Sequence, residues 1–237
     1  MKAVARRAAR WLLTCEHASR DVPDEFREAF ARAGAVMDSH RAWDPGALGV
    51  FSALAPDHAD HASRGRATRL LVDLNRSLHH PRLFSEFTRR LPREVRDRIV
   101  DHWWRPFRDE AESVVAAWRA DGLPVVHLSV HSFTPVLDGH ARTADIGLLY
   151  DPRRAAELGL ARRCRDLLAD RGWSVRLNYP YRGVADGHTT AMRRRHPEGF
   201  AGFELELNQR LFEDAAVERA LLVDLDATLA ALRRNGI

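Results

Sequence analysis

Four short apolar runs of this chain end in residues suited to metal binding or charge chemistry. The four endings are Cys15-Glu16-His17, Asp73-Leu74-Asn75-Arg76, Val130-His131-Ser132 and Glu206-Leu207-Asn208. Histidine and carboxylate side chains bind zinc and transfer protons, and the planar guanidinium of arginine binds carboxylates at two points. These residue types therefore indicate an enzyme that uses a metal ion and acts on an anionic substrate.

Short apolar runs that alternate with helical patterns predict the buried strands of an α/β sheet, and the active site of such a sheet lies outside the carboxyl ends of its strands. We expect helices on both faces of a mainly parallel sheet, with one shared site at that edge. The expected strands are the run before Cys15 and residues 70–74, 125–130, 146–150, 174–178 and 202–207. The expected helices are 21–34, 47–54, 92–120 with a bend at Pro106, 153–171, 187–195 and 215–234, and the expected loops include 56–68 and 132–145.

Two histidines occupy equivalent positions at strand ends. Strand alternation places His127, Ser129 and His131 on one face, and His17 ends the first strand in the same way. A single histidine at a strand end is usually a hydrogen-bonded structural residue. Two imidazoles together with one carboxylate and an open fourth position are typical of a catalytic zinc site.

The carboxylate ligand has four candidates. Glu16 is disfavoured, because it precedes His17 directly and should point to the opposite face of the strand. Asp44 lies in a turn before Pro45-Gly46 and could reach across the strand ends, but it could equally be the N-cap of the following helix. The full set of candidates is Glu16, Asp21, Asp44 and Asp73.

Glu204 and Glu206 lie on the same face of the last predicted strand. Two carboxylates inside an α/β sheet are costly unless they are paired or lie near a solvated site. We predict that Glu206, which is nearer the carboxyl edge, is the general base. The alternative is that this is an edge strand with a solvated face.

Asp73, Asn75 and Arg76 close another predicted strand. A clamp for a substrate carboxylate is one interpretation of this group, and an internal ion pair between Asp73 and an arginine is the other. Arg69 and Arg142, the latter in the predicted loop 132–145, are further candidates for anion binding.

The chain resembles the N-formylglutamate amidohydrolase family. Several motifs match in order and spacing, and three of them are also similar to motifs of the zinc carboxypeptidases, which implies a shared three-layer αβα, phosphorylase/hydrolase-like fold. The matching segments are Cys15-Glu16-His17-Ala18-Ser19, Trp43-Asp44-Pro45-Gly46-Ala47, Val72-Asp73-Leu74-Asn75-Arg76, His131-Ser132-Phe133-Thr134-Pro135, Asp145-Ile146-Gly147, Asn178-Tyr179-Pro180-Tyr181 and Glu206-Leu207-Asn208.

The resemblance implies a set of site residues. The carboxypeptidases have a glutamate three residues after the first histidine ligand, whereas this chain has Arg20 there, so Asp44 is the implied second ligand. The implied zinc ligands are His17, Asp44 and His131, the implied base is Glu206, and the implied substrate-binding residues are Asn75, Arg76, Arg142, Arg69 and Ser132.

The implied reaction is zinc-dependent hydrolysis of N-formyl-L-glutamate to formate and L-glutamate. One alternative is a carboxypeptidase-like enzyme or another N-acyl amino acid deacylase. A second alternative is a metal-free protein that binds a small carboxylate. Under each interpretation the partner is a small anionic molecule.

Composition sets the remaining limits. The 237 residues are 45% hydrophobic with a formal net charge of +4, which suits one catalytic domain over 1–237. The pI of about 9.6 raises nucleic-acid binding as a further class, but the arginines are mixed with acidic residues, as on solvated helix faces. Two cysteines and the absence of a long apolar segment predict a cytoplasmic protein without a membrane partner.

Overall fold

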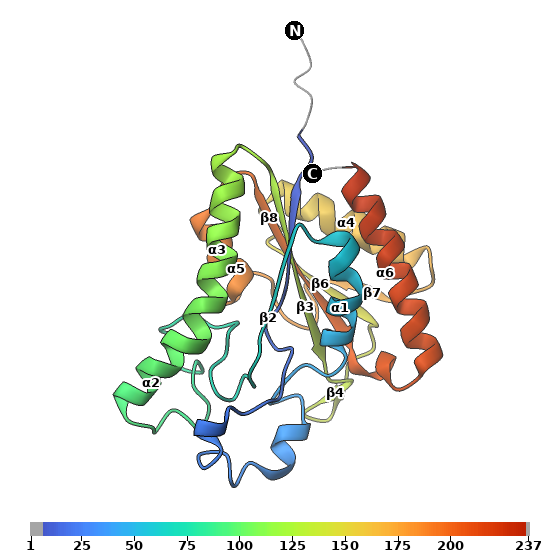
Figure 1. The fold of residues 1–237 in the computed structure, drawn as a ribbon. Coiled ribbons are helices and arrows are strands. Elements are labelled where there is room, and N and C mark those ends of the chain that lie inside the picture. Colours follow the sequence, from blue (N-terminus) through green and yellow to red (C-terminus); the bar gives the residue numbers. More distant parts are fainter. Residues whose placement is uncertain (1–6, 236–237) are drawn as a thin grey trace.

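A six-stranded sheet with the order β2-β1-β3-β8-β6-β7 forms the centre of the molecule (Figure 1). The computed structural model describes residues 7–235, so the outermost residues of the range expected for the domain lie outside it. Neighbouring strands are parallel throughout, except that β6 runs antiparallel to β8. The strands are β1 Arg10–Cys15, β2 His61–Arg64, β3 Val125–Phe133, β6 Ile146–Leu149, β7 Val175–Leu177 and β8 Phe200–Asn208. The predicted mainly parallel mixed sheet is confirmed.

Helices cover both faces of this sheet and complete a three-layer αβα sandwich, as predicted (Figure 1). Helices α1, α4 and α6 lie on one side, and α3 and α5 lie on the other. Among residues 7–235 no helix combines the length and apolar character that a membrane span requires. The α-helices are α1 Ala47–His58, α2 Arg93–Ile99, α3 Arg105–Ala120, α4 Ala155–Ala169, α5 His188–Arg195 and α6 Ala215–Asn235, and the shorter helical segments are Asp24–Phe26, Gly34–Asp38, Val100–Trp104 and Gln209–Phe212.

Strand alternation gives the two faces of the sheet different chemistry. The face toward α1, α4 and α6 is apolar along whole strands, as Val126, Leu128 and Val130 of β3 show. On the other face, β3 begins with Val125, which packs in the small core against α3 and α5, and continues with polar residues toward its carboxyl end. Thr14 of β1 and Glu204 of β8 share this face, because their backbones flank that of Ser129 in the register. One buried sheet face therefore changes from apolar to polar along the strand direction.

The predicted strand 70–74 is wrong. Leu70, Leu71 and Val72 are buried, but none of them is part of a strand, and they pack in a separate core with Trp104 and Phe107. A short apolar run indicates burial, and burial alone does not separate a strand from a packed loop. The edge strand next to β1 is β2, which lies inside the predicted loop 56–68.

Three other predicted elements differ from the structure. The helix expected at 21–34 is replaced by the short segments Asp24–Phe26 and Gly34–Asp38, and the predicted loop 132–145 contains a hairpin of β4 Val136–Leu137 and β5 His140–Ala141. The bend expected at Pro106 takes the form of a π-helical turn, Val100–Trp104, directly before α3. Proline cannot donate to the preceding turn, and a local change of helix type accommodates that loss.

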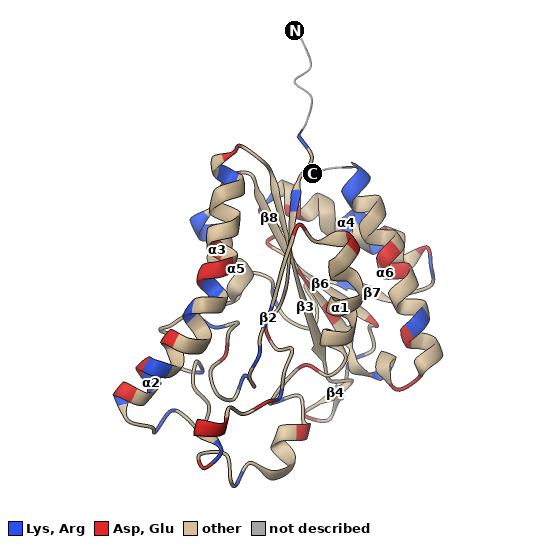
Figure 2. Ribbon diagram, viewed as in Figure 1, with Lys and Arg blue, Asp and Glu red and all other residues tan. Residues whose placement is uncertain are grey.

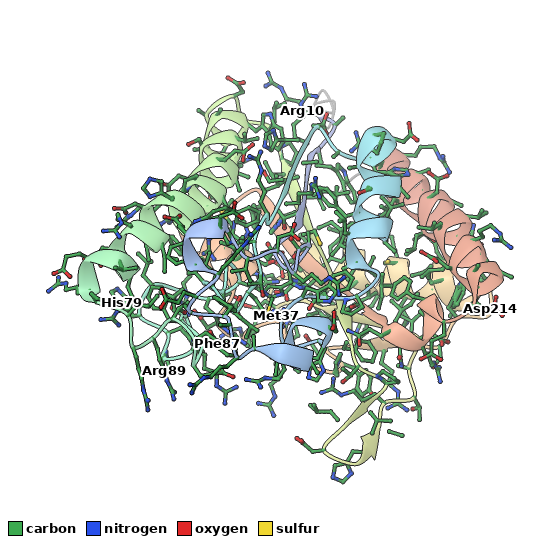
Figure 3. All side chains as sticks on the ribbon, turned by 60° about the horizontal axis from the view of Figure 1, so that its bottom comes forward. Arg10, Met37, His79, Phe87, Arg89 and Asp214 are labelled. Carbon is green, nitrogen blue, oxygen red and sulfur yellow. The ribbon has the colours of Figure 1, made fainter. Side chains whose placement is uncertain are left out.

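Positions of basic and acidic residues are interspersed along α2, α3 and α6 (Figure 2). Loop residues such as His79 and Arg89 lie at the periphery, away from the crowded centre of the molecule (Figure 3). This mixture of charges matches the solvated helix faces expected from the sequence.

Candidate active site

Two histidines and one aspartate converge at the carboxyl ends of β1 and β3. The Nδ1 atom of His131 lies 2.9 Å from Oδ2 of Asp44, and Nδ1 of His17 lies 3.4 Å from the same oxygen. The two imidazole centroids are 5.0 Å apart, and all three residues are buried. The structure therefore brings together the three predicted zinc ligands, His17, Asp44 and His131.

The backbone holds Asp44 in this position. Its own N–H donates to the carbonyl oxygen of His17 (3.0 Å), and the N–H of Ser132 donates to its Oδ2 (3.3 Å). The N–H of Ala47 at the start of α1 donates to the backbone carbonyl of Asp44 rather than to its side chain. The Asp44 carboxylate is thus free of a helix-capping hydrogen bond and points at the histidines.

The far nitrogen of each imidazole also meets a carboxylate. Nε2 of His17 lies 2.7 Å from Oδ1 of Asp73, and Nε2 of His131 lies 3.3 Å from Oε2 of Glu16. Metal-binding histidines commonly have such a partner on the nitrogen that does not bind the metal, because it fixes the ring and strengthens the donor. Two imidazole nitrogens and one carboxylate oxygen with this support suit a divalent cation such as zinc.

Arg69 contacts one of these donor atoms and the second oxygen of the aspartate. Its guanidinium touches Nδ1 of His17 and lies 3.0 Å from Oδ1 of Asp44. A cation held by the donor atoms would compete with the arginine for Nδ1 of His17. Arg69 would then have to give up that contact, and part of its hydrogen-bonding capacity would become available to a bound anion.

Glu206 is a buried acidic residue beside His131. Its backbone lies opposite that of His131 in the β3–β8 register, and its Oε2 has no hydrogen-bond partner within the described residues. Burial raises the pKa of Glu206 to about 8, against the opposing charge of His131, and the carboxylates of Asp44 and Glu204 raise it further. A buried carboxyl group with a free oxygen and a raised pKa is a candidate for general base catalysis.

Glu204 lies one alternation step deeper in the sheet, opposite Ser129. Burial raises its pKa as well, although His131 and Arg193 oppose that shift. Glu206 is nearer the carboxyl edge, where the donor atoms of His131 and Asp44 converge.

Asn75 and Arg76 lie near the two histidines, and both already make polar contacts within the protein. Oδ1 of Asn75 accepts a hydrogen bond from the N–H of His188 (2.6 Å), and its Nδ2 lies 3.3 Å from Nε2 of His131. Nη1 of Arg76 donates to the carbonyl oxygen of Asp186 (2.8 Å), and its Nε lies 3.8 Å from Oδ2 of Asp73. These contacts connect the end of the 65–76 segment to the loop before α5.

Arg142 and Ser132 occupy different parts of the site. The guanidinium of Arg142 lies 5.2 Å from the ring centroid of Tyr181 and 5.8 Å from that of Phe133, beside the β4–β5 hairpin. The hydroxyl of Ser132 donates to the carbonyl oxygen of Pro45 (2.7 Å). Arg142 is thus on the partly exposed side, and Ser132 supports the loop that carries Asp44.

Comparison with known proteins decides the family. The sequence profile described as N-formylglutamate amidohydrolase matches residues 9–213, which is most of the chain. The chain belongs to the N-formylglutamate amidohydrolase family. It is accordingly an enzyme that hydrolyses amide bonds. A comparison with curated proteins found no match.

Two solved structures resemble this N-formylglutamate amidohydrolase family member over nearly its whole length. A gene product of Agrobacterium tumefaciens is 28% identical with a TM-score of 0.80, and the alignment covers 95% of this chain and 90% of that one. An N-formylglutamate amidohydrolase from Ralstonia eutropha JMP134 is 19% identical with a TM-score of 0.68, with coverage of 98% and 96%. The second similarity supports the fold.

Two buried residues of this family member, Glu16 and His188, lie behind His131 and were not expected as site residues from the sequence. Glu16 points away from the His17 side chain, as alternation predicts, and reaches the back of the second histidine instead. His188 at the start of α5 contacts Glu16, and no motif marked it in advance. The available signal for Glu16 was its spacing of two from Thr14, which places it on the polar face of the sheet.

Proposed function

We propose that this chain is a zinc-dependent amidohydrolase that converts N-formyl-L-glutamate to formate and L-glutamate within one catalytic domain. The proposal rests on one arrangement: Nδ1 of His17, Nδ1 of His131 and Oδ2 of Asp44 face one another, with the Glu206 carboxyl group on the adjacent strand. This combination supplies metal donors and a base in one buried place.

His17, Asp44 and His131 would hold the zinc ion. A zinc ion in such a site supplies Lewis acidity, which polarises the amide carbonyl and makes a bound water acidic near neutral pH. Asp73 and Glu16 support this assignment, because they orient the two imidazoles from behind.

Glu206 would move the proton. Its carboxylate takes a proton from the attacking water and returns it to the amide nitrogen as the C–N bond breaks, so that formate and the free amino group leave. Its burial and its unpartnered oxygen support this role. General acid–base catalysis of this kind typically contributes about 10²–10⁴-fold in rate.

Three arginines and two polar side chains would hold the substrate carboxylates. Arg69 lies at the metal donors, Arg76 lies near Asp73, and Arg142 lies outermost beside Tyr181. An N-formyl dicarboxylic amino acid carries two negative charges, and arginine binds carboxylates through paired hydrogen bonds. Asn75 and Ser132 complete the proposed set.

The test is a zinc assay coupled to a substrate screen. We expect about one zinc ion per chain and turnover of N-formyl-L-glutamate faster than of N-acetyl amino acids or short peptides. Preferred turnover of peptides or of other acyl groups would instead indicate a carboxypeptidase-like enzyme or another deacylase. A protein that binds no zinc, even after zinc is added, would contradict the mechanism and leave a metal-free carboxylate-binding protein.

The substitution His131→Ala makes the metal assignment specific. We expect it to abolish zinc binding and hydrolysis together, because it removes one of the three donors. Full zinc occupancy in this variant, measured by atomic absorption after dialysis, would exclude His131 as a ligand.

A further inference from the structure

Glu16 lies at the centre of a fully buried hydrogen-bond network behind the proposed zinc site. Its Oε1 accepts from the Thr14 hydroxyl (2.8 Å) and from Nδ1 of His188 (2.7 Å). Its Oε2 accepts from the Ser129 hydroxyl (2.5 Å) and lies 3.3 Å from Nε2 of His131. A carboxylate has no proton to donate, so every hydrogen in these contacts comes from the partner.

Because Glu16 only accepts, the hydroxyl groups of Thr14 and Ser129 also fix the position of the proton on the imidazoles of His127 and His131. A hydroxyl group has one proton. Thr14 and Ser129 each donate that proton in a hydrogen bond to Glu16, so each hydroxyl oxygen must accept a hydrogen bond from its other neighbour. The other neighbour of Thr14 is Nε2 of His127 (2.8 Å), and that of Ser129 is Nε2 of His131 (2.9 Å). The network therefore places a proton on Nε2 of both His127 and His131, and on Nδ1 of His188. The Asn75 amide nitrogen also lies 3.3 Å from Nε2 of His131, but the Ser129 hydroxyl is closer, at 2.9 Å, and the Glu16 carboxylate adds a second acceptor.

The remaining ring nitrogens of His127 and His188 are consistent with this assignment of protons. Nδ1 of His127 and Nε2 of His188 are buried and have no hydrogen-bond partner among residues 7–235. The assignment makes both of them unprotonated acceptors, which are tolerated without a partner more often than a buried N–H. Their surroundings are apolar on one side, since the Phe107 ring centroid lies 5.4 Å from that of His188.

We propose that Glu16 positions His131 for zinc: it holds a proton on Nε2, so that Nδ1, which faces Asp44 and His17, is the nitrogen left to bind the ion. Glu16 is then a positioning residue, and the proposal rests on the proposed function above. His188 and Thr14 hold the carboxylate from the other side and keep it from rotating.

Glu16, His127 and His188 do not make a second cation site. Donor atoms of Glu16, His127 and His188 lie within 4.8 Å of one another, which alone would allow a metal ion. However, Oε1 of Glu16 already accepts two hydrogen bonds, from Thr14 and His188, and a cation there would have to displace both. The hydrogen bonds explain the cluster as a support for His131.

The substitution Glu16→Gln tests this role. Glutamine keeps the shape but replaces one acceptor oxygen with an NH₂ group, so two of the donors lose their acceptor. We expect zinc affinity, measured by competition with a chromophoric chelator, to fall by about 10–100-fold, as for comparable partners of metal-binding histidines. Melting in the presence of strong chelator reports separately whether the metal-free variant is folded.

Glu157→Gln is the matched control. Glu157 is equally buried and accepts hydrogen bonds from Nε of Arg193 (2.9 Å) and the N–H of Gly202 (3.1 Å), none of them in the proposed zinc site. Its substitution is expected to lower thermal stability and to leave zinc affinity unchanged.

Two substitutions of His188 separate hydrogen bonding from packing. His188→Asn retains an N–H donor close to the position of Nδ1, whereas His188→Ala removes it, and both lose the ring contact with Phe107. We expect zinc affinity close to that of the wild type for asparagine and a clear loss for alanine. Equal losses in the two variants would contradict the proposal.

Nitrogen-15 NMR of the histidine rings in the zinc-loaded protein gives a direct readout. We expect the Nε2–H form for His127 and His131 and the Nδ1–H form for His188. A His131 that binds zinc through Nε2, or equal zinc affinity of the wild type and Glu16→Gln, would overturn the proposal alone. A wild-type protein without zinc binding would overturn the proposed function as well, so the two failures are distinguishable.

Discussion

Two glutamates on one strand face the same side of the sheet, and their immediate surroundings give them different chemistry. Glu206 lies opposite His131 and has a buried oxygen with no hydrogen-bond partner in the part of the chain that the structure describes, whereas Glu204 lies opposite Ser129, one step deeper. Both pKa values are raised by burial, so the shift does not distinguish them. The two residues differ in position, since Glu206 is nearer the carboxyl edge of the sheet, where the proposed metal ligands lie.

Substituting the two glutamates one at a time tests this distinction. Glu206→Gln should bind zinc normally and lower kcat by about 10²–10⁴-fold, because the proton acceptor is lost while the metal donors remain. Glu204→Gln should retain most of its activity. If the Glu204 variant shows the larger loss of kcat at full zinc occupancy, the roles are reversed.

The proposed carboxylate clamp is tested by Arg76→Ala. A lost charge-assisted hydrogen bond is worth about 1.5–3 kcal/mol, so KM for N-formyl-L-glutamate should rise by roughly 10–100-fold with a smaller change in kcat. Arg89→Ala, an exposed loop substitution, is the control and should leave both constants unchanged. An unchanged KM in Arg76→Ala would remove this arginine from the clamp.

At the scale of elements, β6 has a glycine where it runs beside the proposed base. A Cβ atom on Gly147 would lie 1.7 Å from the backbone oxygen of Tyr179 and 3.2 Å from Cβ of Glu206. The segment after β7 therefore approaches β6 so closely that no side chain fits there. This contact connects the 178–181 loop, which carries Tyr181, to the strand that flanks the site.

Gly147→Ala should disturb this contact. Because the clash is with backbone atoms, we expect a loss of stability of about 1–3 kcal/mol and a lower kcat as β6 moves relative to β8. Gly159→Ala in α4 is the control: nothing lies within 4 Å of its added Cβ, and alanine should stabilise the helix by about 1 kcal/mol. Denaturant unfolding and steady-state kinetics measure both effects, and a Gly147→Ala protein as stable as the wild type would contradict the argument.

At the scale of the whole molecule, the buried acids make folding depend on pH. The pKa of Glu206 is about 8 in the folded chain, above its ordinary value of 4.5. Between these values the folded state binds a proton that the unfolded state has lost, so stability decreases as pH rises. The opposite trend holds for the paired carboxylates whose pKa is lowered, such as Asp151 beside Arg153.

Denaturant unfolding of the metal-free protein between pH 5 and pH 8 measures this contribution. Relative to Glu206→Gln, the wild type should lose stability as pH rises, by at most about 1.4 kcal/mol per pH unit. A constant difference between the two proteins across this range would show that the Glu206 carboxyl group titrates normally.

The αβα architecture and the edge of the sheet at which the candidate site lies were both predictable from the sequence. Both follow from local periodicity: alternation on β3 and β8 sets which residues share a face, and the direction of parallel strands sets which end is polar. The expected ranges of α4 and α6 are also close to the observed ones, because long helices repeat their pattern over several turns.

The contacts between side chains depend on the three-dimensional arrangement of the loops. Strand alternation disfavoured Glu16 as a metal ligand, and the family resemblance implied Asp44, but neither indicated where the other carboxylates would lie. In the structure Asp44 faces the two Nδ1 atoms, whereas Asp73 and Glu16 face the Nε2 atoms. The run at 70–72 turned out to be a packed loop, and the strand beside β1 came from an exposed segment without an apolar signal. These outcomes depend on the path of loops between distant segments, and local periodicity carries no information about that path.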